Sequence, residues 1–346
     1  MNGIDAKNFP LFLAFGFTCM FGIQGLAPLQ ANPVSAPEFL SPDSRVETVR
    51  IGETDELQLY RLGPLQTERP AVTLLDPMLF DPGILLRQNG LVEELLDEDY
   101  NVYLMMWKSP DRELEPGAVA LELEKAVSLA RTDCECKEFI AGGLSLGGQR
   151  WLPYLGRLGH DGKANEDSRA NQLHSIFFIG TGLDYSYPQS LYRREGLPIN
   201  ADLSQNCANL SGICLDFIPT IHFKRGLRLR RIPPPLVPPD LAALRMFPEI
   251  LEIPVPVAFV FGKVDGFSPE ESIYPVYRAW AQKTVLWQIR QKYAPYSTDN
   301  PVFWLEGSGA NRIHDYDQFD LFLHPDADDE LYGELVDWIE DAQREP

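Results

Sequence analysis

The chain has 346 residues, of which 45% are hydrophobic, and it carries a formal net charge of −20 with an isoelectric point near 4.6. This length and apolar content suffice for one large α/β core, so a second globular domain is not required. So acidic a surface repels phosphate, which argues against nucleic acid as a partner.

The first predicted element is an apolar run over residues 9–27, preceded by a single basic residue, Lys7. With cleavage after Ala31, residues 1–31 are typical of a secretory signal peptide, and the mature protein is expected to be secreted or periplasmic. The run is also long enough, at roughly twenty residues, to remain as a membrane anchor for an exported domain. Membrane association through this segment is therefore the alternative prediction.

Four cysteines follow this segment: Cys134, Cys136, Cys207 and Cys214. An even number of cysteines in an exported chain indicates disulfides. The first two are too close in sequence for an easy mutual bridge, whereas the last two would close a short loop; pairing between the two groups is the alternative. No histidine lies at ligand spacing from the Cys-x-Cys pair, so we predict neither a metal nor a cofactor.

Residues 40–183 are predicted to form the first part of an α/β core. Residues 46–51 and 57–62 have the pattern of a β-hairpin. Beyond them, strand and helix patterns alternate, which indicates a parallel sheet with right-handed crossovers. The predicted strands are residues 71–75, 101–107, 137–141 and 173–179, and the predicted helices are residues 84–96, 118–130 and 149–158.

The alternation stops over residues 184–253, which are predicted to form a cap insertion. This stretch carries a basic run, which we expect to pair with the protein's own acidic surface; a carboxylate-bearing ligand or an anionic membrane is the alternative. The run consists of Lys224, Arg225, Arg228, Arg230 and Arg231. The core resumes over residues 254–346, with predicted strands at 257–261 and 302–305 and predicted helices at 273–281 and 329–340.

Ser145 lies in the stretch Gly142-Gly143-Leu144-Ser145-Leu146-Gly147-Gly148, between a predicted buried strand and a predicted helix. A strand, a sharp turn carrying serine and a helix form the nucleophile elbow of α/β-hydrolases. Side chains at Gly143 and Gly147 would collide in so tight a turn. The alternative interpretation is a glycine-rich turn with an incidental serine.

A serine nucleophile needs a base, an orienting carboxylate and an oxyanion hole. In α/β-hydrolases the chain order is serine, acid, histidine. Asp265 follows the predicted strand at 257–261 and is the predicted acid; a turn aspartate before Gly266 is the alternative. His314, between the last predicted strand and helix, is the predicted base, with His324 as the fallback.

From about residue 71 to residue 338, the chain resembles the α/β-hydrolase branch that includes polyhydroxyalkanoate synthases and lipase-like relatives. The resemblance is carried by the elbow and by residues 75–80, 100–107, 178–185 and 332–338. It implies an α/β-hydrolase fold, with a mostly parallel central sheet, helices on both faces and a cap insertion. Polyester synthases carry cysteine as the nucleophile, so Ser145 favours hydrolysis over polymer synthesis.

Two further departures from these relatives concern the base and the oxyanion hole. Where relatives often read His-Leu-Asp-Leu, this chain reads Gln318-Phe319-Asp320-Leu321, and glutamine cannot act as a general base. Either His314 has taken that role, or the site has lost its base. Where many relatives have His-Gly, this chain has Asp76-Pro77, so the backbone N–H groups of Met78 and Leu146 are the predicted oxyanion donors.

The leading hypothesis is an exported serine hydrolase that cleaves a carboxylic ester through an acyl-enzyme, using Ser145, Asp265 and His314. Leu79 and Phe80 beside the site suit a lipid-like or polyester-like acyl chain, so the expected partner is a small-molecule or lipid-like ester. The alternative is a non-catalytic protein of the same fold that binds an acyl ligand, because a glutamine occupies the usual histidine position. Hydrolysis of a thioester or lactone would use the same chemistry.

Overall fold

The computed structural model describes residues 46–66, 69–162, 172–188, 190, 192–193, 227–230, 232–253, 255–263, 265–291, 302–306 and 316–344. Within them, eight strands form one sheet in the spatial order β1-β2-β4-β3-β5-β6-β7-β8. β2 is antiparallel to both β1 and β4, and the other neighbouring strands are parallel. The strands are β1 (Thr48–Glu53), β2 (Leu57–Leu62), β3 (Ala71–Leu75), β4 (Asn101–Trp107), β5 (Phe139–Leu144), β6 (Leu173–Ile179), β7 (Val257–Gly262) and β8 (Val302–Glu306).

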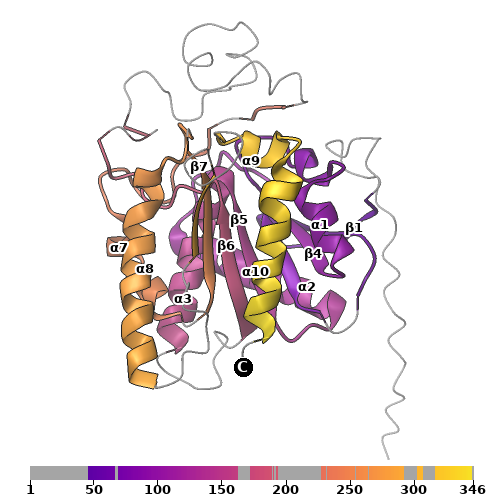
Figure 1. Ribbon diagram of the computed structural model, residues 1–346, viewed down its shortest axis with the longest axis horizontal. Helices are drawn as coiled ribbons and strands as arrows, with labels where there is room; N and C mark the ends of the chain where they lie inside the picture. The colour runs from indigo at the N-terminus through magenta and orange to yellow at the C-terminus, as the bar shows by residue number, and fades with distance from the viewer. Residues whose placement is uncertain are drawn as a thin grey trace, which may run out of the picture. The chain divides into compact units, whose positions relative to one another are not determined.

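Helices connect the parallel strands, as the alternating sequence pattern predicts (Figure 1). The α-helices are α1 (Leu91–Asp97), α2 (Pro116–Cys134), α3 (Leu152–Gly162), α7 (Ala243–Met246), α8 (Glu270–Gln291), α9 (Asp320–Leu323) and α10 (Gly333–Arg344). Shorter segments are the 3₁₀ helices η1 (Pro82–Leu86), η2 (Ser145–Trp151) and η4 (Pro248–Glu252) and the π-helical η6 (Asp328–Tyr332). The prediction of a mostly parallel sheet with crossover helices is thereby confirmed.

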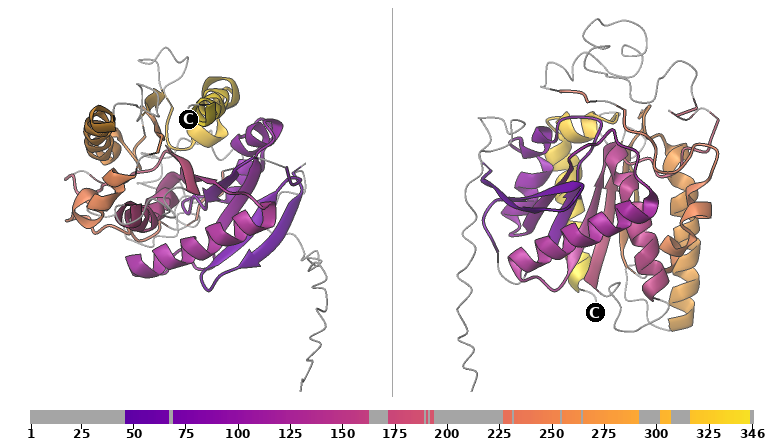
Figure 2. Two further views of the ribbon diagram at one scale, coloured as in Figure 1. Left: turned by 90° about the horizontal axis from the view of Figure 1, so that it is seen from below. Right: turned by 180° about the vertical axis from the view of Figure 1, so that it is seen from behind.

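In strands β2 to β7, alternate residues are buried on opposite faces of the sheet. In β4, Val102 and Leu104 belong to one hydrophobic cluster, while Tyr103 and Met105 belong to the other. This period of two is expected of a strand that is buried on both faces. Helices α1, α9 and α10 cover the first face, and α2, α3 and α8 cover the second (Figure 2).

The predicted helix at residues 84–96 is not continuous. η1 ends at Leu86 and α1 begins at Leu91, because Asn89 has a left-handed φ of 55° and Gly90 has the extended backbone of an N-cap. Near the C-terminus, the predicted helix at 329–340 begins as the π-helical η6 and continues as α10, and the short α9 precedes it; the pattern indicated neither η6 nor α9.

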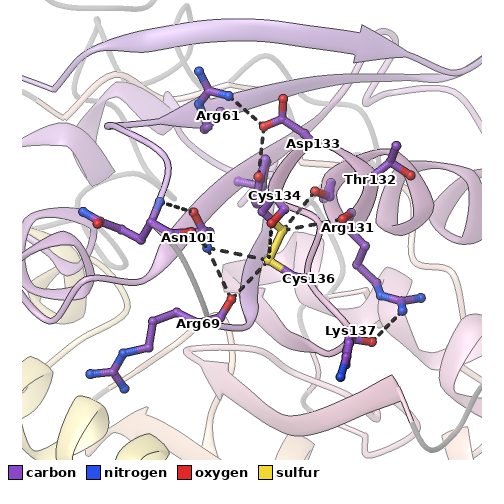
Figure 3. The surroundings of a disulfide bond; sticks show 12 residues. Arg61, Arg69, Asn101, Arg131, Thr132, Asp133, Cys134, Cys136 and Lys137 are labelled. Carbon is purple, nitrogen blue, oxygen red and sulfur yellow. Dashed lines mark hydrogen bonds and ion pairs between the residues drawn. A yellow bond between two sulfur atoms is a disulfide. The ribbon is translucent and has the colours of Figure 1, made fainter.

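The expectation that Cys134 and Cys136 do not pair is wrong. The structure joins them in a disulfide, with their Cα atoms 5.1 Å apart (Figure 3). Helix α2 ends at Cys134, and Glu135 has a left-handed φ of 55° that turns the chain back on itself. Two cysteines that flank such a turn come within bridging distance. Cys207 and Cys214 lie outside the described residues.

The predicted signal segment, residues 1–31, also lies outside the described residues, so both alternatives for it stay predictions. Among the helices that the structure describes, none combines the length and the apolar character needed to cross a bilayer. The division at residues 184–253 into a cap likewise stays a prediction, although described parts of that segment contact the core, as shown below.

Candidate active site

Three polar residues follow the carboxyl ends of parallel strands. Asp76 comes directly after β3, Ser145 directly after β5, and Asp265 follows β7 in a turn where its N–H donates to the Gly262 carbonyl at 3.2 Å. Parallel strands end at a common edge of the sheet, which is where open α/β sheets bind ligands. All three side chains are buried. The sheet therefore gathers the predicted nucleophile and acid, as well as an unpredicted carboxylate, along one edge.

Ser145 occupies a strained turn. Its φ is +49°, in the left-handed region that a residue with a side chain seldom adopts. A Cβ atom on Gly147 would lie 1.8 Å from the Asp76 carbonyl oxygen, and one on Gly143 would lie 2.5 Å from the Phe178 ring. Only glycine fits at either position, as expected if larger side chains would collide in this tight turn. The helical turn after the serine is the 3₁₀ segment η2.

Gln318 lies opposite Ser145. Its Nε2 donates hydrogen bonds of 3.0 Å to Ser145 Oγ and of 3.0 Å to the Gly180 carbonyl. The side chain is only 1% exposed, so these bonds form away from water. The glutamine thus occupies the position that the family resemblance assigns to the base.

The Gly180 carbonyl fixes which end of the Gln318 amide faces the serine. A carbonyl oxygen only accepts, so the Gln318 atom beside it must be the NH₂ group. That group donates to Ser145 Oγ and has no lone pair to receive the serine proton. A hydrogen bond donated to Oγ also withdraws electron density from the atom that would attack a carbonyl. In this arrangement Gln318 does not activate Ser145.

Asp265 is held by one of its two carboxyl oxygens. Oδ1 accepts hydrogen bonds of 2.8 Å from the N–H groups of both Phe267 and Ser268, whereas Oδ2 is buried with no hydrogen-bond partner. Burial raises the pKa of Asp265 to about 7; the two amide bonds oppose this shift, and the charge of Asp317 adds to it. The carboxyl group is therefore substantially protonated near neutral pH.

The loops that carry Asp265 and Gln318 pack against each other on both sides of these residues. A Cβ atom on Gly262 would lie 2.3 Å from the Tyr316 carbonyl oxygen, and the ring centroids of Phe267 and Phe319 are 5.6 Å apart. The Oε1 atom of Gln318, like Oδ2 of Asp265, is buried without a partner. A protonated Asp265 carboxyl can donate a hydrogen bond to an amide oxygen. An ionised carboxylate only accepts hydrogen bonds and cannot do so.

The predicted oxyanion donor at Met78 is already engaged. Its N–H donates to Asp76 Oδ1 at 2.9 Å, and its φ is +64°. Arg230 Nη1 also donates to both oxygens of Asp76 at 2.9 Å. The prediction that Met78 offers a free N–H therefore needs correction: the Asp76 carboxylate takes that donor. Leu146, the second predicted donor residue, is buried in η2 directly after Ser145.

A described part of the predicted cap is tied to the loop after β3. Phe80 forms an antiparallel bridge with Leu229, and the Arg230 N–H donates to the Leu79 carbonyl at 2.9 Å. Arg230 forms an ion pair within the protein, as expected, but its partner Asp76 is fully buried and does not belong to the acidic surface that was predicted to hold the basic run. Leu79 and Phe80 are both fully buried, in the same cluster as the aromatic rings of α9 and the loop before it. The acyl-binding role predicted for these two residues is not tested by these contacts.

The predicted base, His314, lies outside the described residues. The fallback, His324, is engaged in the loop after α9, where its Nδ1 accepts from the Asp326 N–H at 3.2 Å and its ring packs on Tyr316.

The Asp76–Arg230 pair was missed by sequence reasoning. Its signal was present, because Asp76 directly follows the predicted strand at residues 71–75 and Arg230 belongs to the basic run of the predicted cap.

The strand order, the antiparallel β2 within an otherwise parallel run and the serine on a strained turn after β5 define the α/β-hydrolase fold. The predicted fold class is confirmed, and the chain has the fold of the α/β-hydrolase superfamily. The closer resemblance to polyhydroxyalkanoate synthases stays a prediction.

Comparison with known proteins returned no matching family model and no matching curated protein. Among solved structures, a lipase-esterase related protein from Clostridium acetobutylicum is 12% identical, with a TM-score of 0.49 over 82% of this chain and 99% of that one. A Pyrococcus furiosus esterase is 13% identical (TM-score 0.46, 89% and 98% covered). A bacterial membrane phospholipase A is 14% identical (TM-score 0.46, 86% and 87% covered). Likeness at this level concerns the fold alone.

Proposed function

We propose that this protein binds an ester of a lipid-like or polyester-like acid at the Ser145 elbow and, in the arrangement described, does not turn it over efficiently. The observation that carries this proposal is the 3.0 Å hydrogen bond that Gln318 donates to Ser145 Oγ. Acyl transfer needs a group that removes the serine proton, and an amide NH₂ cannot do so. The proposed ligand is the same ester that a hydrolase would cleave, and the protein differs from a hydrolase only because it lacks a base that removes the serine proton.

Two further features support a binding role without efficient chemistry. The Met78 N–H, which would stabilise an oxyanion, donates to Asp76 instead. Asp265, with its pKa raised to about 7 by burial, is poorly suited to stabilise a neighbouring positive charge when it is protonated. Buried apolar residues next to the elbow, including Leu79 and Phe80, favour a ligand with an acyl chain.

The test compares the wild-type protein with Gln318→His and Ser145→Ala. The wild type should quench or shift its tryptophan fluorescence saturably with 4-methylumbelliferyl octanoate, yet hydrolyse it no faster than Ser145→Ala does. Gln318→His should gain hydrolysis and react with a fluorophosphonate probe at Ser145, because an imidazole at position 318 would lie beside Ser145 Oγ, where the Gln318 amide now lies. Wild-type hydrolysis a hundredfold above Ser145→Ala would refute the binding-only proposal.

The second candidate is a serine hydrolase that forms an acyl-enzyme, with His314 as the base. It is favoured by the strained φ of +49° at Ser145 and by the unpartnered Oδ2 of Asp265, which would accept a hydrogen bond from an imidazole. In this case the wild type is active, His314→Ala loses nearly all activity, and His324→Ala is nearly normal. Wild-type activity that survives His314→Ala would exclude this candidate.

We also propose that the protein is exported, either with residues 1–31 removed or with that segment kept as an anchor. The support is the apolar run at residues 9–27 and the even number of cysteines beyond it. Intact-mass measurement of protein from its native host should show a chain that starts near residue 32. A chain that begins at Met1 and stays with the membrane fraction would identify the anchor instead.

A further inference from the structure

The disulfide between Cys134 and Cys136 closes a very small loop. Only Glu135 separates the two cysteines in sequence. A disulfide stabilises a fold mainly by restricting the unfolded chain, and this effect grows with the number of residues in the closed loop. Residues so close in sequence are already near each other in the unfolded chain, so this bridge restricts it little. Its value as a structural cross-link is therefore small.

Backbone hydrogen bonds hold the same turn independently of the bridge. At the end of α2, the N–H groups of Glu135 and Cys136 both donate to the Arg131 carbonyl, the second of them at 3.0 Å. The Arg131 side chain also donates to the Lys137 carbonyl (Figure 3). These bonds form a helix C-cap around Glu135, whose φ is 55°. The turn therefore keeps its shape when the bridge opens, and the two sulfur atoms stay adjacent.

The surroundings of the two sulfur atoms suit thiols. Cys136 Sγ lies 3.1 Å from the Arg69 carbonyl oxygen, and Cys134 Sγ lies 3.3 Å from the Ala130 carbonyl oxygen. A thiol can donate a hydrogen bond to a carbonyl oxygen, whereas a disulfide sulfur has no hydrogen to donate. Reduction would thus give each carbonyl an additional donor that already lies close enough to form a hydrogen bond.

Asn101 provides a donor to the sulfur of Cys136. Its Nδ2 lies 3.6 Å from Cys136 Sγ (Figure 3). The Asn101 side chain is fully buried, and its direction is fixed because Oδ1 accepts from the Gln66 N–H at 2.8 Å while Nδ2 donates to the Gln66 carbonyl at 3.1 Å. An N–H directed at sulfur stabilises the thiolate through which thiol–disulfide exchange proceeds. A disulfide whose reduced form is stabilised in this way is readily reduced.

We propose that Cys134 and Cys136 form a redox-active site that exchanges with small-molecule thiols. Both cysteines are partly exposed and pack against the hydrophobic cluster beneath α2, which limits access to small thiols. The pair precedes β5 and Ser145 follows it, so the two sites lie at opposite ends of one strand. This activity is therefore independent of the function proposed for the Ser145 site.

The exchange takes two steps. A thiolate attacks one sulfur of the bridge, so that a mixed disulfide forms and the other cysteine leaves as a thiolate. A second thiolate then attacks the small-molecule sulfur of the mixed disulfide and releases the remaining cysteine. Two thiols thereby lose two protons and two electrons and become one small-molecule disulfide. The bridge gains the same protons and electrons and becomes two cysteine thiols.

The experiment equilibrates the full chain with reduced and oxidised glutathione in varied ratios, quenches it with acid and alkylates free thiols with N-ethylmaleimide. Trypsin cuts after Arg131 and Lys137, so mass spectrometry of the peptide of residues 132–137 counts the thiols of this pair alone. We expect excess reduced glutathione to add two maleimide groups to this peptide and excess oxidised glutathione to restore the bridge. The circular dichroism spectrum should stay unchanged throughout. A bridge that stays oxidised in excess reduced glutathione would overturn the proposal.

Two variants separate exchange from a structural role. Cys136→Ser lacks the second thiol that resolves a mixed disulfide, so oxidised glutathione should leave one glutathione on its peptide, whereas the wild-type peptide should not accumulate this adduct. If the adduct does not form, Cys134 is out of reach of small thiols and the proposal is wrong. The double variant Cys134→Ser/Cys136→Ser should keep a nearly unchanged midpoint of thermal unfolding. If either variant fails to fold, or if reduction unfolds the wild type, the bridge is structural and the proposal is likewise wrong.

Discussion

Replacing Asp265 by asparagine should change how the stability of the protein depends on pH. Burial raises the pKa of this carboxyl from 3.8 to about 7 in the folded protein. A group whose folded pKa is raised binds its proton more tightly in the native state, so its stabilising effect is complete below pH 3.8 and is lost as pH rises through 7.

The magnitude follows from proton linkage. Between pH 5 and pH 8, a carboxyl with pKa values of 3.8 unfolded and about 7 folded removes about 2.5 kcal/mol from the free energy of unfolding. Asp265→Asn has no proton to lose and should not show this decrease. The variant should therefore gain about 2.5 kcal/mol relative to the wild type between the two pH values.

The assay is urea unfolding followed by circular dichroism at pH 5 and pH 8, after refolding yield has been shown to be complete. Groups that do not interact with Asp265 titrate equally in both proteins, so the difference between them reports on Asp265 and on its repulsion with Asp317. Ser145→Ala is the matched control, because it changes the same buried site without adding or removing a titratable group. Parallel pH dependence in the wild type and Asp265→Asn would refute the assignment of a raised pKa. A wild type that gains stability with pH relative to the variant would show that the ionised form has a partner.

Three further predictions concern the turn, the ion pair and the disulfide. Gly147→Ala should destabilise the protein by more than about 3 kcal/mol or prevent folding, because its Cβ would lie 1.8 Å from the Asp76 carbonyl oxygen. Gly156→Ala is the control: the nearest atom to its Cβ would lie 3.6 Å away, so the midpoint of thermal unfolding should change only slightly. Arg230→Ala should lower the free energy of unfolding in urea by about 3 kcal/mol, because it leaves the Asp76 carboxylate buried without a counter-ion. Adding Asp76→Asn to that variant should restore part of this loss. If the effects of the two substitutions on the free energy of unfolding are strictly additive, the two residues do not act as a pair. Iodoacetamide should label Cys134 and Cys136 only after reduction, as peptide mass spectrometry can show, and labelling without a reductant would contradict the bridge.

Much of the fold could be predicted because the parallel strands are continuous buried runs. β3, for example, is buried at every position, and β4 is as well, which local composition reveals directly. Helix continuity was harder to predict. The apolar spacing of residues 84–96 suits a helix, but the break depends on the left-handed conformation of Asn89, which asparagine adopts more readily than most residues but only where the surrounding structure requires it. The disulfide was missed for the same reason, since it depends on the left-handed Glu135.

The site could be predicted in part. Gly143 and Gly147 indicate the turn because no other residue fits there, and Gln318 was identified as the residue at the histidine position. Two features could not be predicted from the sequence: the orientation of the Gln318 amide, which the Gly180 carbonyl sets, and the hydrogen bond that the Met78 N–H donates to Asp76. Both depend on contacts between loops that are distant along the chain and have no local pattern.

The bond between Asp76 and Arg230 also has a consequence for how the protein folds. These residues are 154 positions apart in sequence, and both oxygens of Asp76 accept from the arginine. Contacts of such long range form slowly, because the chain entropy lost on closing the loop is large. During synthesis the carboxylate emerges long before its counter-ion, so Asp76 stays hydrated until Arg230 has been made. A refolding experiment should therefore see the sheet form before the environment of Ser145 closes.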